Sequence, residues 1–233
     1  MKKLPIGIQT FSEIIEKNYV YVDKTGIASR LVDRYKYVFL SRPRRFGKSL
    51  FLDTLHNLFE GRKELFTGLA AEKEHDWSKT YPVIRISFGA GNFRSPEMLQ
   101  LTILETLKDN EERLETCCEI EEVSARFSRI IKAVHEKYNK PVAILIDEYD
   151  KPILDNIDQP EMAAFTREIL KAFYSVIKDN DAHIRFAFLT GVTKFSKVSV
   201  FSGINDIVDI SLNSQYGTIC GYTQHDLETV FAR

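Results

Sequence analysis

A run of five apolar residues at positions 142–146 constrains the fold of this chain more than any other feature. The run, Val142-Ala143-Ile144-Leu145-Ile146, has no polar residue on either face of an extended strand. Strands of this kind occur in parallel sheets that helices cover on both sides. Further short apolar runs at 37–40, 83–88, 184–189 and 207–210 alternate with longer segments of helical period. This alternation predicts an α/β fold with a mostly parallel sheet.

The segments between these runs predict helices after residue 49 and over about 98–107, 127–134 and 162–176. The second of them is predicted from the apolar residues Met98, Leu101, Leu104 and Leu107. No repeat, low-complexity tract or Gly/Ser linker interrupts the pattern, so we expect a single domain over residues 1–233. The chain ends soon after a helix-like start at 223–228, and we therefore expect a C-terminal lid or further domain to be missing.

The composition argues against several classes of protein. There are 32 basic and 33 acidic residues, and the net charge is −1. This balance gives the chain as a whole no attraction for nucleic acid or an anionic membrane, although a local basic patch remains possible. The three cysteines form neither a disulfide framework nor a zinc-binding spacing. No apolar stretch approaches the roughly 20 residues needed to cross a bilayer. We expect a cytoplasmic protein with reduced thiols.

The apolar run 37–40 leads into a loop and then into an amphipathic helix. Such a loop, ending in Gly47-Lys48-Ser49, is the context of a phosphate-binding loop, because N–H groups at a helix start cradle phosphate oxygens. Lys48 would contact the β- and γ-phosphates, and the Ser49 hydroxyl would ligate magnesium. The residues expected to bind the nucleotide are Arg44, Arg45, Phe46, Gly47, Lys48, Ser49 and Leu50. The alternative is a basic surface turn.

Position 42 departs from the usual phosphate-loop pattern, because Arg42 stands where the first glycine is expected. If the backbone there is left-handed, arginine costs about 1–2 kcal/mol more than glycine. Alternatively, the loop follows another path that Pro43 partly fixes. Arg42, Arg44 and Arg45 would also add positive charge near a polyanion.

An acidic pair, Asp147-Glu148, directly follows the buried run 142–146. The carboxyl ends of parallel strands are where α/β sheets bind ligands. Asp147 would hold magnesium through its water, and Glu148 would orient or deprotonate the attacking water. The alternative is an acidic pair that simply opens a loop. Asp150 is either an outer carboxylate of the site or a turn or helix cap before Pro152.

Thr190 ends the apolar run 184–189. If this strand lies between the phosphate-loop strand and the acidic strand, Thr190 would face the γ-phosphate and position the lytic water. An ordinary strand-terminal threonine is an equally good interpretation. Lys194 could supply charge in the same chain or across a subunit interface.

Several segments of the sequence resemble a bacterial AAA-ATPase-like family. They are Leu4-Pro5-Ile6-Gly7-Ile8-Gln9, Tyr19-Val20-Tyr21-Val22-Asp23-Lys24-Thr25, the loop 39–49, and the stretches 189–196 and 201–205. The resemblance covers essentially the whole chain. It implies a P-loop NTPase fold, a three-layer αβα sandwich with sheet order 5-1-4-3-2, and it implies that arginine at position 42 is normal.

The same resemblance implies ATP and Mg²⁺ as cofactors and assigns catalytic roles to Lys48, Glu148 and Thr190, with Ser49 and Asp147 at the metal. It leaves the role of the Asp23-Lys24-Thr25 signature open. That signature could contact the nucleotide base or the back of the phosphate loop, or it could cap a helix. Relatives can continue into a PD-(D/E)XK nuclease-like region, but no nuclease activity is inferred for this chain.

The expected function is a magnesium-dependent ATPase module that drives a conformational change in an attached or partner component, with a homo-oligomer or a protein as possible partner. A first alternative is a switch or scaffold that binds nucleotide without hydrolysing it. A second is a nucleic-acid-processing module that uses basic residues of the loop together with Lys194.

Overall fold

The computed structural model describes residues 2–193, 204 and 207–231. In this part of the chain five strands form one parallel sheet, ordered β2-β3-β4-β1-β5. The strands are β1 (Tyr37–Ser41), β2 (Val83–Ser87), β3 (Val142–Asp147), β4 (Ile184–Gly191) and β5 (Val208–Asp209). The expected α/β sandwich and the expected sheet order are both confirmed, because 5-1-4-3-2 is this order counted from the other edge.

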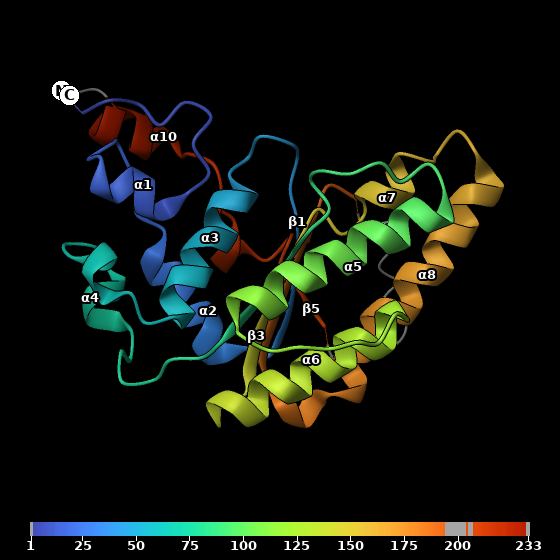
Figure 1. Ribbon diagram of the computed structural model, residues 1–233. Coiled ribbons are helices and arrows are strands. Elements are labelled where there is room, and N and C mark those ends of the chain that lie inside the picture. The colour runs from blue at the N-terminus through green and yellow to red at the C-terminus, as the bar shows by residue number, and fades with distance from the viewer. Residues whose placement is uncertain (1, 194–203, 205–206, 232–233) are drawn as a thin grey trace.

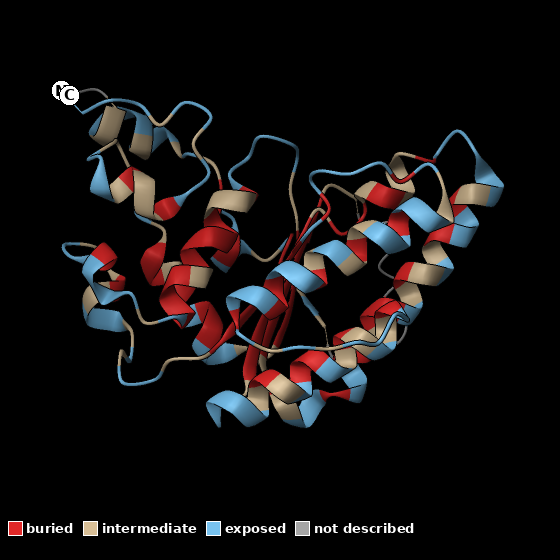
Figure 2. Ribbon diagram, in the orientation of Figure 1, coloured by how far each residue is buried: buried red, intermediate tan, exposed pale blue. Residues whose placement is uncertain are grey.

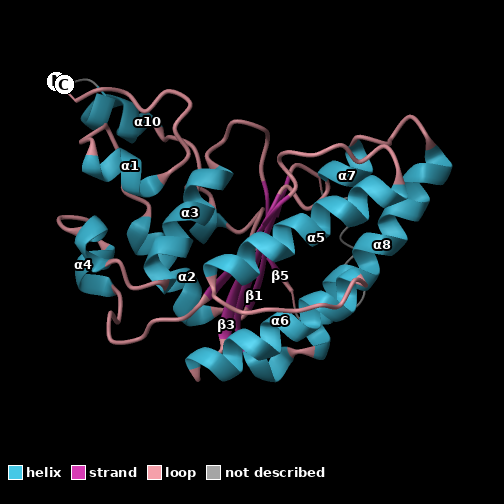
Figure 3. Ribbon diagram, viewed as in Figure 1, coloured by secondary structure: helices cyan, strands magenta, loops and turns pink. Residues whose placement is uncertain are grey.

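Helices cover both faces of the sheet (Figure 1). Helices α5 (Pro96–Arg113), α6 (Val123–Tyr138) and α8 (Pro160–Asp179) lie on one face, and α2 (Thr25–Arg34) and α3 (Lys48–Phe59) lie on the other. The shorter elements are α1 (Phe11–Glu16), η1 (Lys63–Phe66), α4 (Ala71–Glu74), α7 (Lys151–Leu154), η2 (Asp181–His183), η3 (Ser214–Tyr216), α10 (Gln224–Asp226) and η4 (Leu227–Phe231). Figure 3 shows the strands enclosed between the two layers of helices.

The position of β3 between two layers of helices explains why its sequence is apolar from 142 to 146. Val142, Ile144 and Ile146 pack with α5, α6 and α8 in one hydrophobic core. Ala143 and Leu145 face the opposite way and pack with α2 and α3 in a second core. Both layers of buried residues are visible in Figure 2. A strand between two cores has no solvent-facing side, so a polar residue would be buried without a partner on either face.

The parallel register brings the polar strand ends to one edge of the sheet. Leu40 pairs with Thr190 across β1 and β4, and Ser87 pairs with Asp147 across β2 and β3. Strand β4 lies between β1 and β3, which is the condition under which Thr190 was expected to reach the site. In the described ranges 2–193 and 207–231, no helix is long and apolar enough to cross a membrane.

Candidate functional site

The loop between β1 and α3 turns sharply before the helix begins. Arg45 and Gly47 have left-handed backbones, with φ of 62° and 89°. Gly47 is followed directly by the first residue of α3, Lys48. The first N–H groups of a helix have no acceptor within the helix, so this end of α3 can bind an anion. Arg44, Arg45, Phe46 and Gly47 are exposed, while Ser49 and Leu50 are partly buried.

Lys48 lies inside the loop. Only 5% of this residue is exposed to solvent. The ammonium Nζ donates hydrogen bonds to the carbonyl oxygens of Arg42 and Pro43, each at 3.0 Å. These carbonyls belong to the start of the loop, whereas Lys48 follows its end. The side chain therefore connects the two ends of the loop and places a positive charge between them.

Arg42 does not take the left-handed conformation that a glycine would favour, since it is not among the described residues with positive φ. The expected cost of 1–2 kcal/mol therefore does not arise at this position. Its guanidinium donates to the carbonyl oxygens of Ser211 at 2.7 Å, Ser41 at 3.0 Å and Tyr216 at 3.2 Å. The side chain therefore joins the loop to the segment after β5, a structural role that the sequence did not indicate.

Asp147 and Thr190 meet at the carboxyl ends of β3 and β4. Asp147 is 4% exposed, and its Oδ1 accepts hydrogen bonds from the Thr190 hydroxyl and, at 3.0 Å, from the backbone N–H of Glu148. Thr190 is fully buried. Its hydroxyl donates directly to the Asp147 carboxylate and so orients it. The sequence did not predict this direct contact between the two residues.

Glu148 differs from Asp147 in both backbone and exposure. It has a φ of 54°, which is uncommon for a residue with a side chain, and it is partly exposed. Its carboxyl carbon would lie 3.8 Å from a Cβ placed on Gly89, just beyond β2. Backbone strain of this kind costs about 1–3 kcal/mol and is concentrated at functional sites.

Asp150 holds the loop that follows β4. The residue is 1% exposed, and its Oδ2 accepts hydrogen bonds from the Val192 N–H at 3.0 Å, the Thr193 N–H at 2.7 Å and the Thr193 hydroxyl at 2.6 Å. Asp150 is also the residue that precedes α7 at its N-cap position, before Pro152, but its side chain makes no capping bond there. The Tyr149 hydroxyl donates to the Thr193 carbonyl at 3.0 Å and fixes the same loop from its other side.

Gly191, which sequence reasoning did not single out, is required by this packing. A Cβ at this position would collide with the Tyr149 ring and lie 2.7 Å from Asp150 Oδ1. The glycine therefore lets the end of β4 approach the residues that follow β3. The Thr190-Gly191 pair was the available signal, because glycine inside a strand can mark a close approach of another segment.

Replacing Asp150 by alanine is expected to lower the free energy of unfolding by about 3 kcal/mol, because two backbone N–H groups and a hydroxyl lose their acceptor. Asp150→Asn keeps the shape and one acceptor oxygen, so it should cost less. Urea unfolding midpoints measure both variants. The matched control is Asp158→Ala at an exposed position. A midpoint for Asp150→Ala equal to that of the control would contradict this role.

Comparison with known proteins identifies the family of this chain. The model of a family described as "Predicted AAA-ATPase" matches residues 5–201. The chain belongs to this AAA-ATPase-like family. It is 54% identical over 232 residues to an uncharacterized protein in the vnfD 5′ region of Azotobacter chroococcum mcd 1. No solved structure matches.

The match extends over only part of that relative. The match covers 99% of this chain and 45% of the relative, so the chain spans about half the relative's length. Neither comparison shows a nuclease-like region.

The residues of this AAA-ATPase-like chain suit a magnesium ion that is held mainly by a nucleotide. Mg²⁺ prefers oxygen ligands and is usually bound by one or two carboxylates together with phosphates and water. The Ser49 hydroxyl and the Asp147 carboxylate would supply such oxygens. Among the residues that the structure describes, no cluster of three or more His, Cys, Asp or Glu could hold a metal by itself. Lys194, the remaining candidate, lies outside the described residues.

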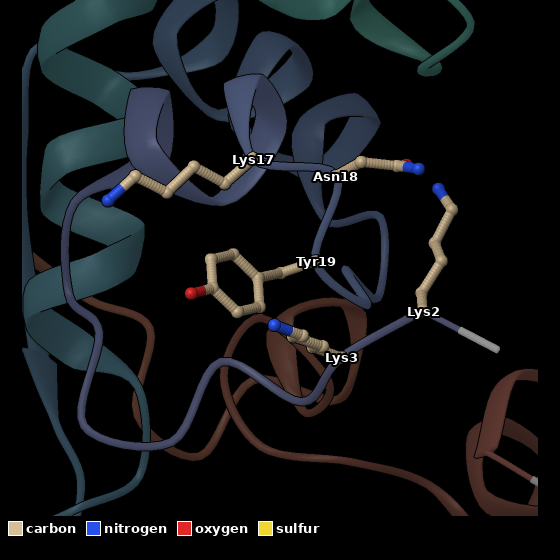
Figure 4. A pocket seen from close by; sticks show the side chains of 5 residues that line it. All are labelled: Lys2, Lys3, Lys17, Asn18 and Tyr19. Atoms are coloured by element: carbon tan, nitrogen blue, oxygen red, sulfur yellow. The ribbon is translucent and has the colours of Figure 1, made fainter.

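Two cavities lie among other residues. One of about 450 Å³ is lined by Lys2, Lys3, Lys17, Asn18 and Tyr19 (Figure 4). The other, of about 620 Å³, is lined by Ile27, Arg30, Asp33, Arg34, Gln215 and Tyr216. Neither is lined by a predicted site residue. In Figure 4 the side chains of Lys2 and Asn18 point toward each other, while Lys17 points away from them.

Proposed function

We propose that this chain binds ATP with Mg²⁺, hydrolyses it, and uses the reaction to change the conformation of an attached or partner component. The observation that carries the proposal is the arrangement at one edge of the sheet. A buried lysine lies inside the loop before α3, and two strands away β3 ends in an acidic pair. The strand between them ends in the threonine that bonds the first of these carboxylates. Membership of the AAA-ATPase-like family supports the same proposal.

Each residue has a distinct role in the proposal. Lys48 binds the β- and γ-phosphates, together with N–H groups at the start of α3. Ser49 and Asp147 hold the magnesium, and Thr190 keeps the Asp147 carboxylate oriented. The metal neutralises charge on the phosphate oxygens. Glu148 takes the proton of the water that attacks the γ-phosphorus, while the bond from that phosphorus to the bridging oxygen of ADP breaks.

ATP is favoured over GTP by the family and by the sequence. The sequence contains no Asn-Lys-x-Asp segment of the kind that reads guanine. The nucleic-acid alternative loses part of its support, because one of its proposed contacts, Arg42, donates to three backbone carbonyls. We place the protein in the cytoplasm, where ATP is available.

The deciding experiment measures ATP binding and phosphate release by the purified chain, with Mg²⁺ and with a chelator. We expect binding in magnesium and phosphate release that the chelator abolishes. Binding without release would select the nucleotide switch instead. The absence of binding in magnesium would overturn the proposal.

A further inference from the structure

Lys24 belongs to the Asp23-Lys24-Thr25 signature, whose role the sequence left open. Its neighbours fix the backbone from which it projects. Asp23 accepts from the Thr25 N–H at 2.8 Å and from the Ala70 N–H at 2.7 Å. Thr25 accepts from the Ala71 N–H at 3.0 Å. These bonds join the start of α2 to the start of α4, so the flanking residues have a structural role that does not involve the lysine.

The Lys24 side chain points instead to the C-terminal segment. Its Nζ lies 3.3 Å from Asp226 Oδ2 in α10, 202 residues away in the sequence. The two side chains are 13% and 15% exposed. A largely buried ammonium needs a partner of opposite charge, and Asp226 supplies it. The same Asp226 oxygen accepts from the Thr223 N–H at 2.8 Å, so the aspartate keeps a partner if the lysine leaves.

The segment that carries Asp226 also touches the phosphate loop. A Cβ on Gly221 would lie 2.7 Å from the ring of Phe46, and a Cβ on Gly47 would lie 4.0 Å from the Gly221 nitrogen. Residues 221–226 therefore run from the loop to Lys24. Figure 1 shows α10 beside the N-terminal part of the chain, with the loop before α3 nearby.

The pKa of the Cys220 thiol responds both to Lys24 and to residues of the phosphate loop. Burial raises the pKa of this thiol to about 12, while the positive charges of Arg42, Lys48 and Lys24 act in the opposite direction. The negative charge of Asp147 raises the pKa further. The charges of Lys24 and of the proposed nucleotide site therefore act on the same buried thiol.

We propose that Lys24 is a further nucleotide-binding cation, with Asp226 as its counter-ion in the empty site and the phosphate chain of ATP as its counter-ion in the filled site. This inference rests on the proposed function. A polyphosphate carries more negative charge than a carboxylate, so it attracts the ammonium more strongly at equal distance. When Lys24 turns to the phosphates, Asp226 loses an ion pair and α10 is held less firmly. Nucleotide occupancy is thereby coupled to the C-terminal segment.

A four-member cycle tests the coupling: wild type, Lys24→Gln, Asp226→Asn and the double variant. The dissociation constant for ATP with Mg²⁺ is measured by calorimetry. Lys24→Gln is expected to weaken binding about tenfold, the effect of losing one charge-assisted hydrogen bond. Asp226→Asn is expected to tighten binding about two- to fivefold, because the lysine no longer has to leave a charged partner. That gain should vanish in the double variant, since it acts through Lys24.

The matched control is Lys36→Gln. This change also removes a lysine that pairs with an aspartate, Asp181, at 2.7 Å, but next to the amino end of β1 and far along that strand from the loop. Its affinity for ATP should equal that of wild type. Lys24→Arg keeps the charge and should bind within about twofold of wild type.

Hydrogen exchange supplies a readout that a merely structural ion pair would not change. ATP should increase amide exchange in residues 223–231 of the wild type and should leave it unchanged in Lys24→Gln. Equal affinities in wild type and Lys24→Gln, or a gain from Asp226→Asn that persists without Lys24, would overturn the inference while leaving the proposed function intact. If the wild type binds no ATP, the proposed function fails and this inference fails with it.

Discussion

Glu148→Gln is expected to lower the rate of ATP hydrolysis by about 100-fold or more while leaving the affinity for ATP within about twofold. Glutamine has nearly the same size as glutamate but cannot accept a proton from the attacking water. Removal of a positioned general base typically costs 10²- to 10⁴-fold in rate. Affinity should change little, because in the proposed mechanism Glu148 acts on water and not on the phosphates.

The geometry distinguishes Glu148 from two other carboxylates at the carboxyl end of β3, Asp147 in the strand and Asp150 after it. Asp147 is buried and accepts from Thr190 and from the Glu148 N–H. Asp150 is buried and holds the Val192–Thr193 backbone. Glu148 is partly exposed on a left-handed backbone. It is therefore the member of this group whose carboxylate is best placed to exchange a proton with water.

Phosphate release at saturating ATP and Mg²⁺ measures the effect, with calorimetric binding on the same samples. The matched control is Glu136→Gln, an exposed position on α6. Its rate should equal that of wild type. A Glu148→Gln rate equal to that of the control would remove Glu148 from the proposed mechanism.

The sheet was predictable from sequence because its strands are locally distinctive. An apolar run such as 142–146 is typical of a strand between two cores, and the structure places its residues in both. The meeting of Asp147 with Thr190 was predictable only conditionally. It requires β4 to lie between β1 and β3, and this order came from the family resemblance rather than from the residues of any one strand.

The helix predicted from Met98, Leu101, Leu104 and Leu107 is confirmed as α5, but these four residues do not form its buried face. Met98 and Leu101 are exposed, and the buried apolar positions of the helix are Leu99, Ile103 and Leu107. A helix turns about 100° per residue, so positions 98 and 107 lie on opposite faces, whereas steps of four residues drift by about 40°. A series spaced by three residues therefore cannot remain on one face over three turns.

Long-range contacts account for the features that the sequence could not reveal. The acceptors of Arg42 are carbonyl oxygens of residues 41, 211 and 216, and β5 brings the last two beside the loop by pairing with β1. Backbone acceptors leave no side-chain signature in a sequence. The role of Asp150 could not be read from the sequence for the same reason. Two of its donors are backbone N–H groups more than 40 residues away.

Lys48→Ala is expected to weaken ATP binding about 100-fold. The lysine is buried, so the charge-assisted bonds that it would make to phosphate fall near the upper end of their usual range, about 3 kcal/mol. In the structure the same ammonium donates to the carbonyls of Arg42 and Pro43. Those acceptors lie at the start of an exposed loop that water can reach, so stability without nucleotide should fall by only about 1 kcal/mol.

Thermal unfolding with and without ATP separates these two effects. A ligand at 100 times its dissociation constant stabilises the folded state by about 2.7 kcal/mol, whereas at a concentration equal to that constant it contributes about 0.4 kcal/mol. The same ATP concentration should therefore raise the unfolding temperature of wild type by several degrees and leave Lys48→Ala almost unchanged. The control, Lys63→Ala at an exposed position, should respond as wild type does. If ATP stabilised Lys48→Ala as much as wild type, the phosphates would have to bind away from the start of α3, and the roles assigned to Ser49 and Asp147 would fail together with that of Lys48.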